Sequence, residues 1–250
     1  MAAGLGLEFT RQILSTGESV VSTCRNPTGA IELQNLKEKY GDKLLIVGMD
    51  TSVDSSIHQA YEEVKNHCER SGTTLHRLIN VSGLLHDASV GMLPETSYTK
   101  IQRSNLQRAF ETNAWGPILV CQQFLPLLIQ SGQTYRDSPA VIANMSARVS
   151  SIGDNGLGGW YSYRSSKAAL NQLTKCLSIE IARKKTNVAA ILMHPGTCDT
   201  DLSKPFQRNV PPDKLFSKER GVKQLLNIIN NIQAADNGKF FAWDGQTIEW

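Results

Sequence analysis

Short runs of apolar residues alternate along the chain with longer segments in which apolar residues recur every three or four positions. A short run that is apolar on both faces indicates a buried strand, and the longer period indicates a helix packed on one side. The predicted strands are residues 19–23, 44–47, 75–80, 140–144, 188–193 and 239–243. The predicted helices are residues 5–15, 55–70, 99–113, 118–130, 163–184 and 218–234. This alternation predicts an α/β fold over residues 1–250, a single domain built on a doubly wound, mostly parallel sheet.

Helix starts and irregular segments refine this picture. Asp54 and Ser217 each stand just before a predicted helix, where a side-chain oxygen can accept a hydrogen bond from the free N–H groups of the first turn. Long irregular segments that follow strands in such folds commonly shape a substrate site. We therefore expect three segments to line one, namely 84–95, the glycine-rich 150–160 and the proline-containing 200–214.

Charge and composition exclude several classes of function. The 250 residues carry a formal net charge of +3 with acids and bases mixed, so we expect no nucleic-acid partner. No apolar run reaches the roughly 18 residues of a membrane span, so we expect no membrane partner. The five cysteines are scattered, which predicts a reducing compartment, no disulfide framework and no metal site. Because no signal or transit segment is evident, we expect a cytoplasmic protein, with an organellar address on a longer form left open.

The strongest chemical signal is the pair Tyr163 and Lys167. Residues four apart on a helix share a face, so the phenol and the ammonium project in the same direction. A nearby cation favours the phenolate and lowers the pKa of the tyrosine from its usual value near 10. Such a tyrosine could protonate a carbonyl oxygen during reduction, or deprotonate an alcohol in the reverse reaction. A surface tyrosine and lysine without any function are the alternative for the pair taken alone.

Other polar or glycine-containing segments follow predicted strands and support the catalytic interpretation. They are residues 80–83, 144–147 and 194–197, and Asn113 lies near the end of a predicted helix. In an open α/β sheet the ligand crevice lies at the carboxyl ends of the strands. We therefore expect these residues to converge on one edge of the sheet together with Tyr163 and Lys167.

With these residues in place, the chain resembles the short-chain dehydrogenase/reductase family over essentially its whole length. The segments 158–171 (GGWYSYRSSKAALN) and 238–250 are most similar to the C-factor-like branch of that family. The resemblance implies a Rossmann fold and an oxidoreductase that interconverts a small carbonyl and an alcohol by hydride transfer to or from a nicotinamide cofactor. It also implies a homodimer or homotetramer that pairs through the helix beginning at Tyr163.

The resemblance assigns expected roles to individual residues. Tyr163 is the expected general acid/base, Lys167 the partner that holds the nicotinamide ribose, and Asn113 the holder of a water in a proton relay. The remaining matches are on the cofactor side: Asn80 and Gly83 in the turn after the fourth family strand, Asp50 against adenine, and Pro195, Gly196 and Thr200 against the carboxamide.

The choice between NADP and NAD has a physical argument. An acid at the end of the second family strand hydrogen-bonds the 2′-hydroxyl of NAD and repels a phosphate. Here that strand ends without an acid, and Arg25 follows it with a donor fork suited to the 2′-phosphate of NADP. We expect NADP, with NAD the less favoured cofactor and a solvated loop arginine the alternative for Arg25.

One departure from the family pattern concerns the catalytic serine. Ala147 stands at the position of that serine, and Ser146 is one residue earlier, where a strand turns its side chain the other way. Ser146 is therefore the candidate to polarise the substrate, and local packing or capping is the alternative for it. Ser150 or Ser151 could instead reach in from the glycine-rich loop.

A second departure concerns the glycine-rich turn after the first family strand. Gly4 and Gly6 match its last two glycines and could present amides to the pyrophosphate, but the strand, the threonine and the first glycine have no counterpart. The fold class therefore includes a missing first strand, and the strands on either side of it should face a gap. Three explanations for the missing strand stay open. The chain is a shortened gene product, its neighbouring strands close over the gap with weakened cofactor binding, or it is a non-catalytic remnant. The last leaves open a cofactor-poor interaction or signalling protein on the same scaffold.

Overall fold

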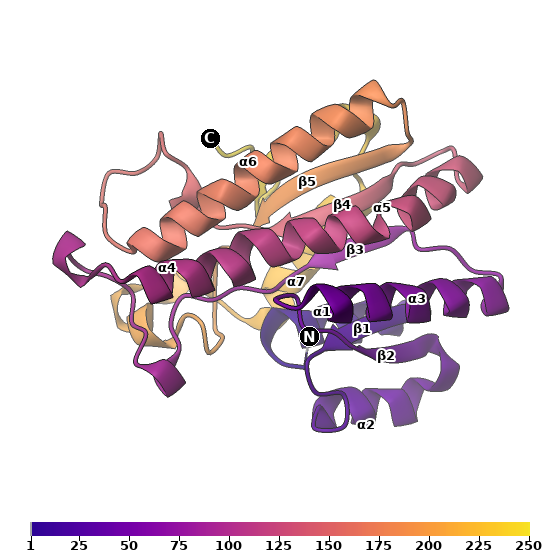
Figure 1. The fold of residues 1–250 in the computed structure, drawn as a ribbon, viewed down its shortest axis with the longest axis horizontal. Helices are drawn as coiled ribbons and strands as arrows, with labels where there is room; N and C mark the ends of the chain where they lie inside the picture. Colours follow the sequence, from indigo (N-terminus) through magenta and orange to yellow (C-terminus); the bar gives the residue numbers. More distant parts are fainter. Residues whose placement is uncertain (1) are drawn as a thin grey trace.

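The computed structural model describes residues 2–250 and places helices on both faces of parallel strands (Figure 1). The helices are α1 (Gly4–Ser15), α2 (Ile31–Tyr40), α3 (Asp54–Ser71), α4 (Arg103–Phe110), α5 (Gly116–Thr134), α6 (Tyr161–Arg183) and α7 (Lys218–Asn230). The strands are β1 (Val20–Cys24), β2 (Leu44–Gly48), β3 (Arg77–Asn80), β4 (Ala140–Met145), β5 (Val188–His194), β6 (Thr197–Cys198), β7 (Leu215–Phe216) and β8 (Phe240–Ala242). Helices and strands alternate along the chain in the structure, which confirms the predicted α/β fold.

Three helix predictions need correction. Helix α2 was not predicted, because its buried apolar side chains are only Leu33 and Leu36. The predicted helix 99–113 is in fact α4 followed by a π-helical turn, Glu111–Trp115. Asp54 does not cap α3 from outside but lies in its first turn, where its negative charge favours the helix dipole. The prediction for Ser217 is confirmed, because its side chain accepts a hydrogen bond from the backbone N–H of Arg220.

The main strands are all parallel, but they form two separate sheets. One sheet has the order β3-β4-β5-β8, and β1 pairs with β2 in the other. Within residues 2–250 no backbone pairing joins β1 to β3, so the predicted gap between these strands is confirmed. The alternative in which the neighbouring strands close over the gap is wrong for this structure.

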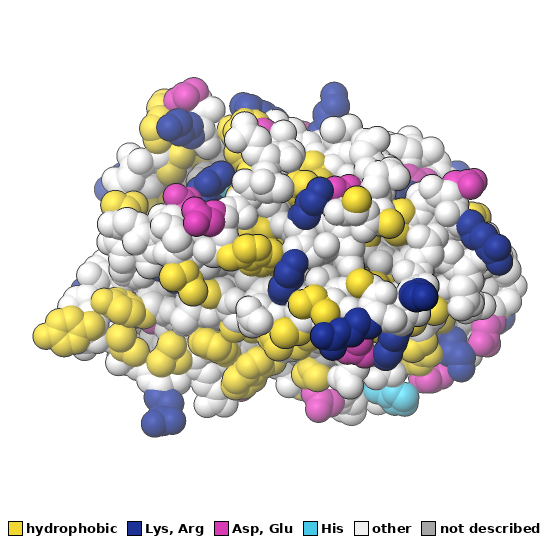
Figure 2. Space-filling view, turned by 90° about the horizontal axis from the view of Figure 1, so that it is seen from above, with side chains coloured by type: hydrophobic (Ala, Val, Ile, Leu, Met, Phe, Trp, Pro, Cys, Tyr) yellow, Lys and Arg dark blue, Asp and Glu magenta, His cyan; other side chains and the backbone are white. Residues whose placement is uncertain are grey.

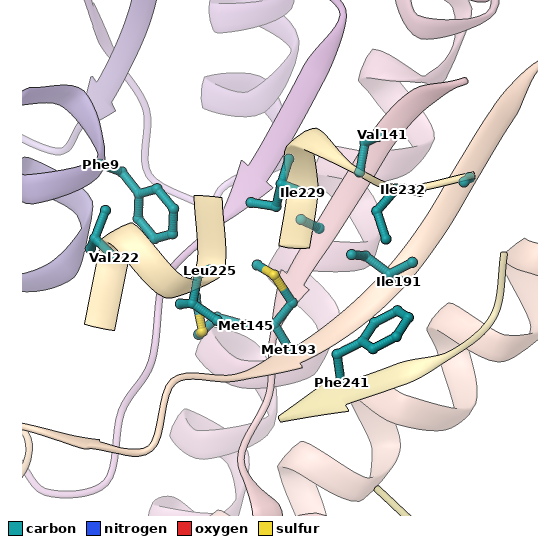
Figure 3. Close-up of a cluster of buried hydrophobic side chains, with 12 residues drawn as sticks. Phe9, Val141, Met145, Ile191, Met193, Val222, Leu225, Ile229, Ile232 and Phe241 are labelled. Carbon is teal, nitrogen blue, oxygen red and sulfur yellow. The ribbon is translucent and has the colours of Figure 1, made fainter. Parts of the chain in front are cut away.

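Apolar side chains hold the helices on the two faces. On one face, Phe9 of α1 packs with Val222 and Leu225 of α7 against Met193 of β5 (Figure 3). On the other face, α3, α5 and α6 cover the strands, and α5 and α6 run across β4 and β5 (Figure 1). Burying one such side chain contributes about 1.5–3 kcal/mol to the stability of the fold. These clusters therefore hold in place the strands whose ends bear the candidate site residues.

Candidate active site

A cavity of about 1280 Å³ opens at the carboxyl ends of the parallel strands. Its walls contain these residues expected from the sequence: Gly4, Gly6, Arg25, Asp50, Asn80, Gly83, Ser146, Tyr163, Lys167, Pro195, Gly196 and Thr200. Asn113 lies behind the wall and is fully buried. The walls also take residues from each of the three segments expected to shape a substrate site. The site therefore collects residues that are far apart in the sequence at one edge of the fold.

Lys167 lies on the buried face of α6 with its ammonium directed at the end of the sheet. Its Nζ atom donates hydrogen bonds to the carbonyl oxygens of Met145, at 2.7 Å, and Ser82, at 3.4 Å. Burial lowers the pKa of Lys167 to about 7, because desolvation penalises the charged form. The two carbonyl dipoles hold the amine at the point where β3 and β4 end.

Tyr163 stands one helical turn before Lys167, in an apolar part of the wall. It packs with Leu85 and Ala147, and its ring lies edge-on to that of Trp160 with centroids 6.3 Å apart. This burial raises the pKa of Tyr163, because the phenolate would be poorly solvated among these side chains. The expected lowering by a nearby cation is therefore not what this structure shows.

Asn113 sits in the π-helical turn, and its amide bridges two other elements. Its Oδ1 accepts from the N–H of Leu84 at 2.7 Å, while its Nδ2 donates to the carbonyl of Leu84 and to Oγ of Ser166. Ser166 in turn donates to the carbonyl oxygen of Tyr163. Asn113 thus ties the loop after β3 to the first turns of α6. Its role in holding a water stays a prediction.

Ser146 lines the cavity, but its hydroxyl is engaged with α6. Its Oγ donates to Oδ1 of Asn171 at 2.6 Å and lies 3.1 Å from Oγ of Ser150. Ser150 donates to the carbonyl of Ala147, and neither it nor Ser151 reaches the wall of the cavity. Ser146 is therefore the serine of this strand end that borders the cavity, and its part in polarising a substrate stays a prediction.

The part of the cavity wall formed by α1 has the features of an anion site. The N-terminus of α1 opens onto it, with Ala3 as an N-cap that makes no side-chain bond and with no acid in the first turn. A helix N-terminus of this kind presents free N–H groups and a positive dipole end to a phosphate. Exposed Arg25 and half-buried Asp50 follow β1 and β2. The pKa of Asp50 is lowered by hydrogen bonds from Ser52 and, more weakly, by the charge of Arg25.

The segment after β5 also lines the cavity. Gly196 has a φ of +72°, and a Cβ at this position would lie 2.6 Å from Cε2 of Phe216, so the turn requires glycine. His194, the last residue of β5, has a buried Nδ1 atom without a hydrogen-bond partner among residues 2–250. Burial lowers the pKa of His194 to about 4, so the ring is neutral at pH 7.

Glu95 does not line the cavity but positions the helix that does, and it was not singled out from the sequence. Its buried carboxylate accepts hydrogen bonds from the N–H and hydroxyl of Ser162 in the first turn of α6. Its carbonyl oxygen accepts from the N–H of Trp160, whose φ of +51° is left-handed. Glu95 thereby fastens the loop after β3 to the helix that carries Tyr163. No local pattern around Glu95 signals this contact, because the two partners are 67 positions apart.

In residues 2–250, no helix is long and apolar enough to cross a membrane. The same residues contain no group of three or more His, Cys, Asp or Glu side chains placed to hold a metal ion.

Comparison with known proteins gives a consistent assignment. A family model described as short chain dehydrogenase matches residues 1–211. The 1-hydroxy-2-glutathionyl-2-methyl-3-butene dehydrogenase of Rhodococcus sp. (strain AD45) is 27% identical over 247 residues, which cover 99% of this chain and 95% of that protein. The C-signal of Myxococcus xanthus is 31% identical over 150 residues, or 60% of this chain and 81% of the C-signal.

Solved structures resemble the chain over its full length. The NADPH-bound carbonyl reductase from chicken fatty liver has a TM-score of 0.86 and 30% identity, covering 100% of this chain and 96% of that one. The carbonyl reductase Sniffer of D. melanogaster has a TM-score of 0.87 and 25% identity with the same coverage.

Proposed function

The chain belongs to the short-chain dehydrogenase family and is an NAD(P)-dependent oxidoreductase, and we propose that it reduces a small carbonyl compound to an alcohol with NADPH. The observation that carries this proposal is that Tyr163 and Lys167 line the same cavity as the N-terminus of α1. The similarity to an NADPH-bound carbonyl reductase supports the same reaction class. We also propose that residues 1–250 form one NAD(P)-binding domain.

The residues at the anion end fit NADPH better than NADH. The N-terminus of α1, with Gly4 and Gly6, would hold the pyrophosphate, and Arg25 would meet the 2′-phosphate. Asp50 is held by Ser52 at the end of the neighbouring strand, where it would contact the adenine. Asn80 and Gly83 would line the adenosine side of the cofactor. Pro195, Gly196 and Thr200 would contact the carboxamide.

Proton transfer is assigned to Tyr163. When bound, NADPH supplies the hydride. The alkoxide that forms at the carbonyl oxygen is about as basic as hydroxide and far more basic than a phenolate, so even a phenol with a raised pKa protonates it. A raised pKa also keeps Tyr163 protonated at pH 7, which favours carbonyl reduction over alcohol oxidation. Lys167 would bind the ribose hydroxyls, Asn113 would hold a relay water, and Ser146 remains the candidate to polarise the carbonyl.

The test is turnover by the 250-residue chain and by a Tyr163→Phe variant. We expect the wild type to oxidise NADPH in the presence of small aldehydes and ketones, followed by the loss of NADPH absorbance. The Tyr163→Phe variant should lose at least a hundredfold in kcat while still binding NADPH, because only the proton donor is removed. The matched control is Tyr161→Phe, an exposed phenol two residues earlier on α6. Full activity of Tyr163→Phe would refute the assignment.

A cofactor-poor signalling protein is the second candidate. It is favoured by the similarity to the C-signal and by Ala147 at the position of the usual serine. This candidate predicts no change in the melting temperature at millimolar NADPH, and a cellular role that survives Tyr163→Phe. Carbonyl reduction predicts the opposite result in both measurements.

Assembly and location are also part of the proposal. We propose a homodimer or homotetramer formed through α6, which exposes the apolar side chains of Tyr161 and Ile179. Viewed from the side on which α6 lies, apolar side chains are interspersed with charged ones of both signs (Figure 2). Light scattering during size-exclusion chromatography tests this assembly. The five free cysteines support a cytoplasmic location.

A further inference from the structure

Around the phenol of Tyr163, the wall of the cavity is aromatic and aliphatic. Leu85, Trp160 and Phe206 come from the three irregular segments that were expected to shape a substrate site, one from each. The side chains that line the cavity and also share one apolar cluster with Tyr163 are Leu85, Ala147, Val149, Trp160, Leu202 and Phe206. We name these six side chains the aromatic pocket, because two of them add further rings beside the reacting phenol.

The indole of Trp160 contacts both of the other rings. Its centroid lies 5.0 Å from that of Phe206, at an interplanar angle of 52°. It meets the ring of Tyr163 edge-on, with centroids 6.3 Å apart. Trp160 and Phe206 are only half-buried, and both line the cavity. Part of each ring is therefore accessible to a molecule whose carbonyl group reaches Tyr163.

The backbone of Trp160 fixes the direction of its indole. Its φ of +51° is left-handed, a conformation that is rare for a bulky side chain and that is concentrated at functional sites. The Trp160 N–H donates to the carbonyl oxygen of Glu95 at 2.6 Å, and its own carbonyl accepts from the N–H of Arg164 at 2.9 Å. Because these two bonds hold the residue, the aromatic face is in place before a ligand binds.

The charged side chains next to the aromatic pocket are already paired. Arg148, Asp201 and Asp87 line the cavity and stand within two positions of pocket residues in the sequence. The pairs are Arg148 with Asp154, Asp201 with Lys204, and Asp87 with Arg108. The wall around the aromatic pocket is therefore close to neutral. A charged group on a bound molecule would lose water there without gaining a free counter-charge.

We propose that the substrate is an uncharged aldehyde or ketone that carries a flat aromatic ring one or two carbons from its carbonyl group, and that Trp160 and Phe206 select this ring. A carbonyl at the phenol of Tyr163 brings such a ring against the indole, because Trp160 and Tyr163 are in direct contact. Aromatic rings prefer edge-on or offset arrangements with centroids 4.5–7 Å apart, which a saturated ring of the same size cannot use. This inference rests on the proposed function for the identity of the reacting group.

The first test compares phenylacetaldehyde with cyclohexylacetaldehyde. The two aldehydes have the same chain next to the carbonyl and similar ring volumes, so they differ mainly in the flatness and the π-face of the ring. We expect kcat/KM with NADPH to be roughly tenfold higher for the phenyl compound, since two aromatic side chains favour it. A para-carboxy derivative of phenylacetaldehyde should be a poorer substrate than its methyl ester, because the wall offers no free cation.

A matched pair of variants assigns the preference to the aromatic pocket. Phe206→Leu keeps an apolar side chain but removes a ring, so the phenyl preference should fall to a few-fold at most. Tyr98→Leu also replaces an aromatic ring by leucine, but Tyr98 is exposed and does not line the cavity. This control should keep the full preference. Equal kcat/KM for the two aldehydes in the wild type, or an unchanged preference in Phe206→Leu, overturns the proposal.

Binding of the alcohol products separates this inference from the proposed reaction. Ligand-observed NMR of the 250-residue chain with NADPH gives the dissociation constants of phenylethanol and cyclohexylethanol, without any need for turnover. We expect phenylethanol to bind several times more tightly, and more weakly to Phe206→Leu than to the wild type. Equal binding of the two alcohols, or no binding of either at millimolar concentration, overturns the inference. Tighter binding of phenylethanol by a chain that reduces no aldehyde would support the aromatic pocket and overturn the proposed reaction.

Discussion

The ammonium of Lys167 lies 2.7 Å from the carbonyl oxygen of Met145, the last residue of β4. This contact joins the helix that carries Tyr163 directly to the end of the central strand. The lysine is only 2% exposed, and the cost of burying its charge lowers its pKa to about 7. The site therefore contains an amine that titrates in the neutral range, and this property can be measured in the unliganded protein.

Lys167 should make stability rise with pH. Between its folded pKa of about 7 and its ordinary value of 10.5, the unfolded chain binds more protons at this site than the folded chain. The contribution of Lys167 to the free energy of unfolding therefore increases from pH 7 to pH 10. A Lys167→Met variant keeps the length of the side chain but removes the titrating amine and its pH-dependent contribution to the free energy of unfolding. We expect it to be more stable than the wild type at pH 7, with the advantage shrinking toward pH 10.

The measurement is the difference in melting temperature between variant and wild type across that pH range. A difference is needed because the buried thiols Cys121 and Cys198, whose pKa values burial raises to about 12, act in the opposite direction in both proteins. Lys184→Met, at the exposed C-cap of the same helix, is the control and should give a flat difference. A flat difference for Lys167→Met would contradict the prediction.

Gly132 in α5 should not tolerate a side chain. A Cβ at this position would lie 2.2 Å from the carbonyl oxygen of Asn187, a backbone atom that cannot move away easily. Gly132→Ala should cost about 1–3 kcal/mol of stability, as overpacking of a tight contact does. For a chain of this size that lowers the melting temperature by roughly 2–12 °C. Gly156→Ala, with no atom within 4 Å of its Cβ, is the control and should differ little from wild type.

Arg25 should set the preference for NADPH. Replacing it by alanine removes the cation proposed for the 2′-phosphate, so KM for NADPH should rise at least tenfold while KM for NADH changes little. Steady-state kinetics with both cofactors measures this selectivity. Arg70→Ala, at the exposed end of α3, is the matched control. An equal loss with both cofactors would show that Arg25 does not recognise the phosphate.

The apolar runs were sufficient to predict β1 to β5 and β8, because such runs mark buried strands whatever their neighbours, but not the two-residue strands β6 and β7. The gap between β1 and β3 was predicted from the family resemblance. The sequence was also sufficient to bring Tyr163 and Lys167 to one face, since helical spacing is local. The pKa of Tyr163 could not be derived in this way. Its direction depends on the enclosure of the phenol by Leu85 and Trp160, which come from segments without a regular pattern.

Tertiary contacts also explain the other differences. The local pattern of apolar residues does not predict the π-helical turn Glu111–Trp115. The hydrogen bonds of Asn113 to Leu84 and Ser166 hold this turn in place. The contact of Glu95 with Ser162 is likewise visible only once the loop after β3 is folded over α6. Long-range hydrogen bonds of this kind determine how the site is assembled, and a one-dimensional pattern does not contain them.

Ala147→Ser should increase carbonyl reduction. Ala147 packs against Tyr163 in the wall of the cavity, so a hydroxyl at this position would face a carbonyl group bound next to the phenol. Ser146, by contrast, donates its hydroxyl to Asn171. A hydrogen-bond donor placed at a developing oxyanion contributes about 2.7–4 kcal/mol, so kcat/KM should rise at least tenfold.

The gain should depend on proton transfer by Tyr163. The double variant Ala147→Ser/Tyr163→Phe should therefore be as inactive as Tyr163→Phe alone, because the added donor can stabilise only an oxyanion that is then protonated. A second comparison concerns Ser146. If Ser146 supplies the present donor, Ser146→Ala lowers kcat and adding Ala147→Ser restores it. Unchanged kcat/KM in Ala147→Ser, with NADPH binding intact, would show that position 147 does not face the reacting carbonyl.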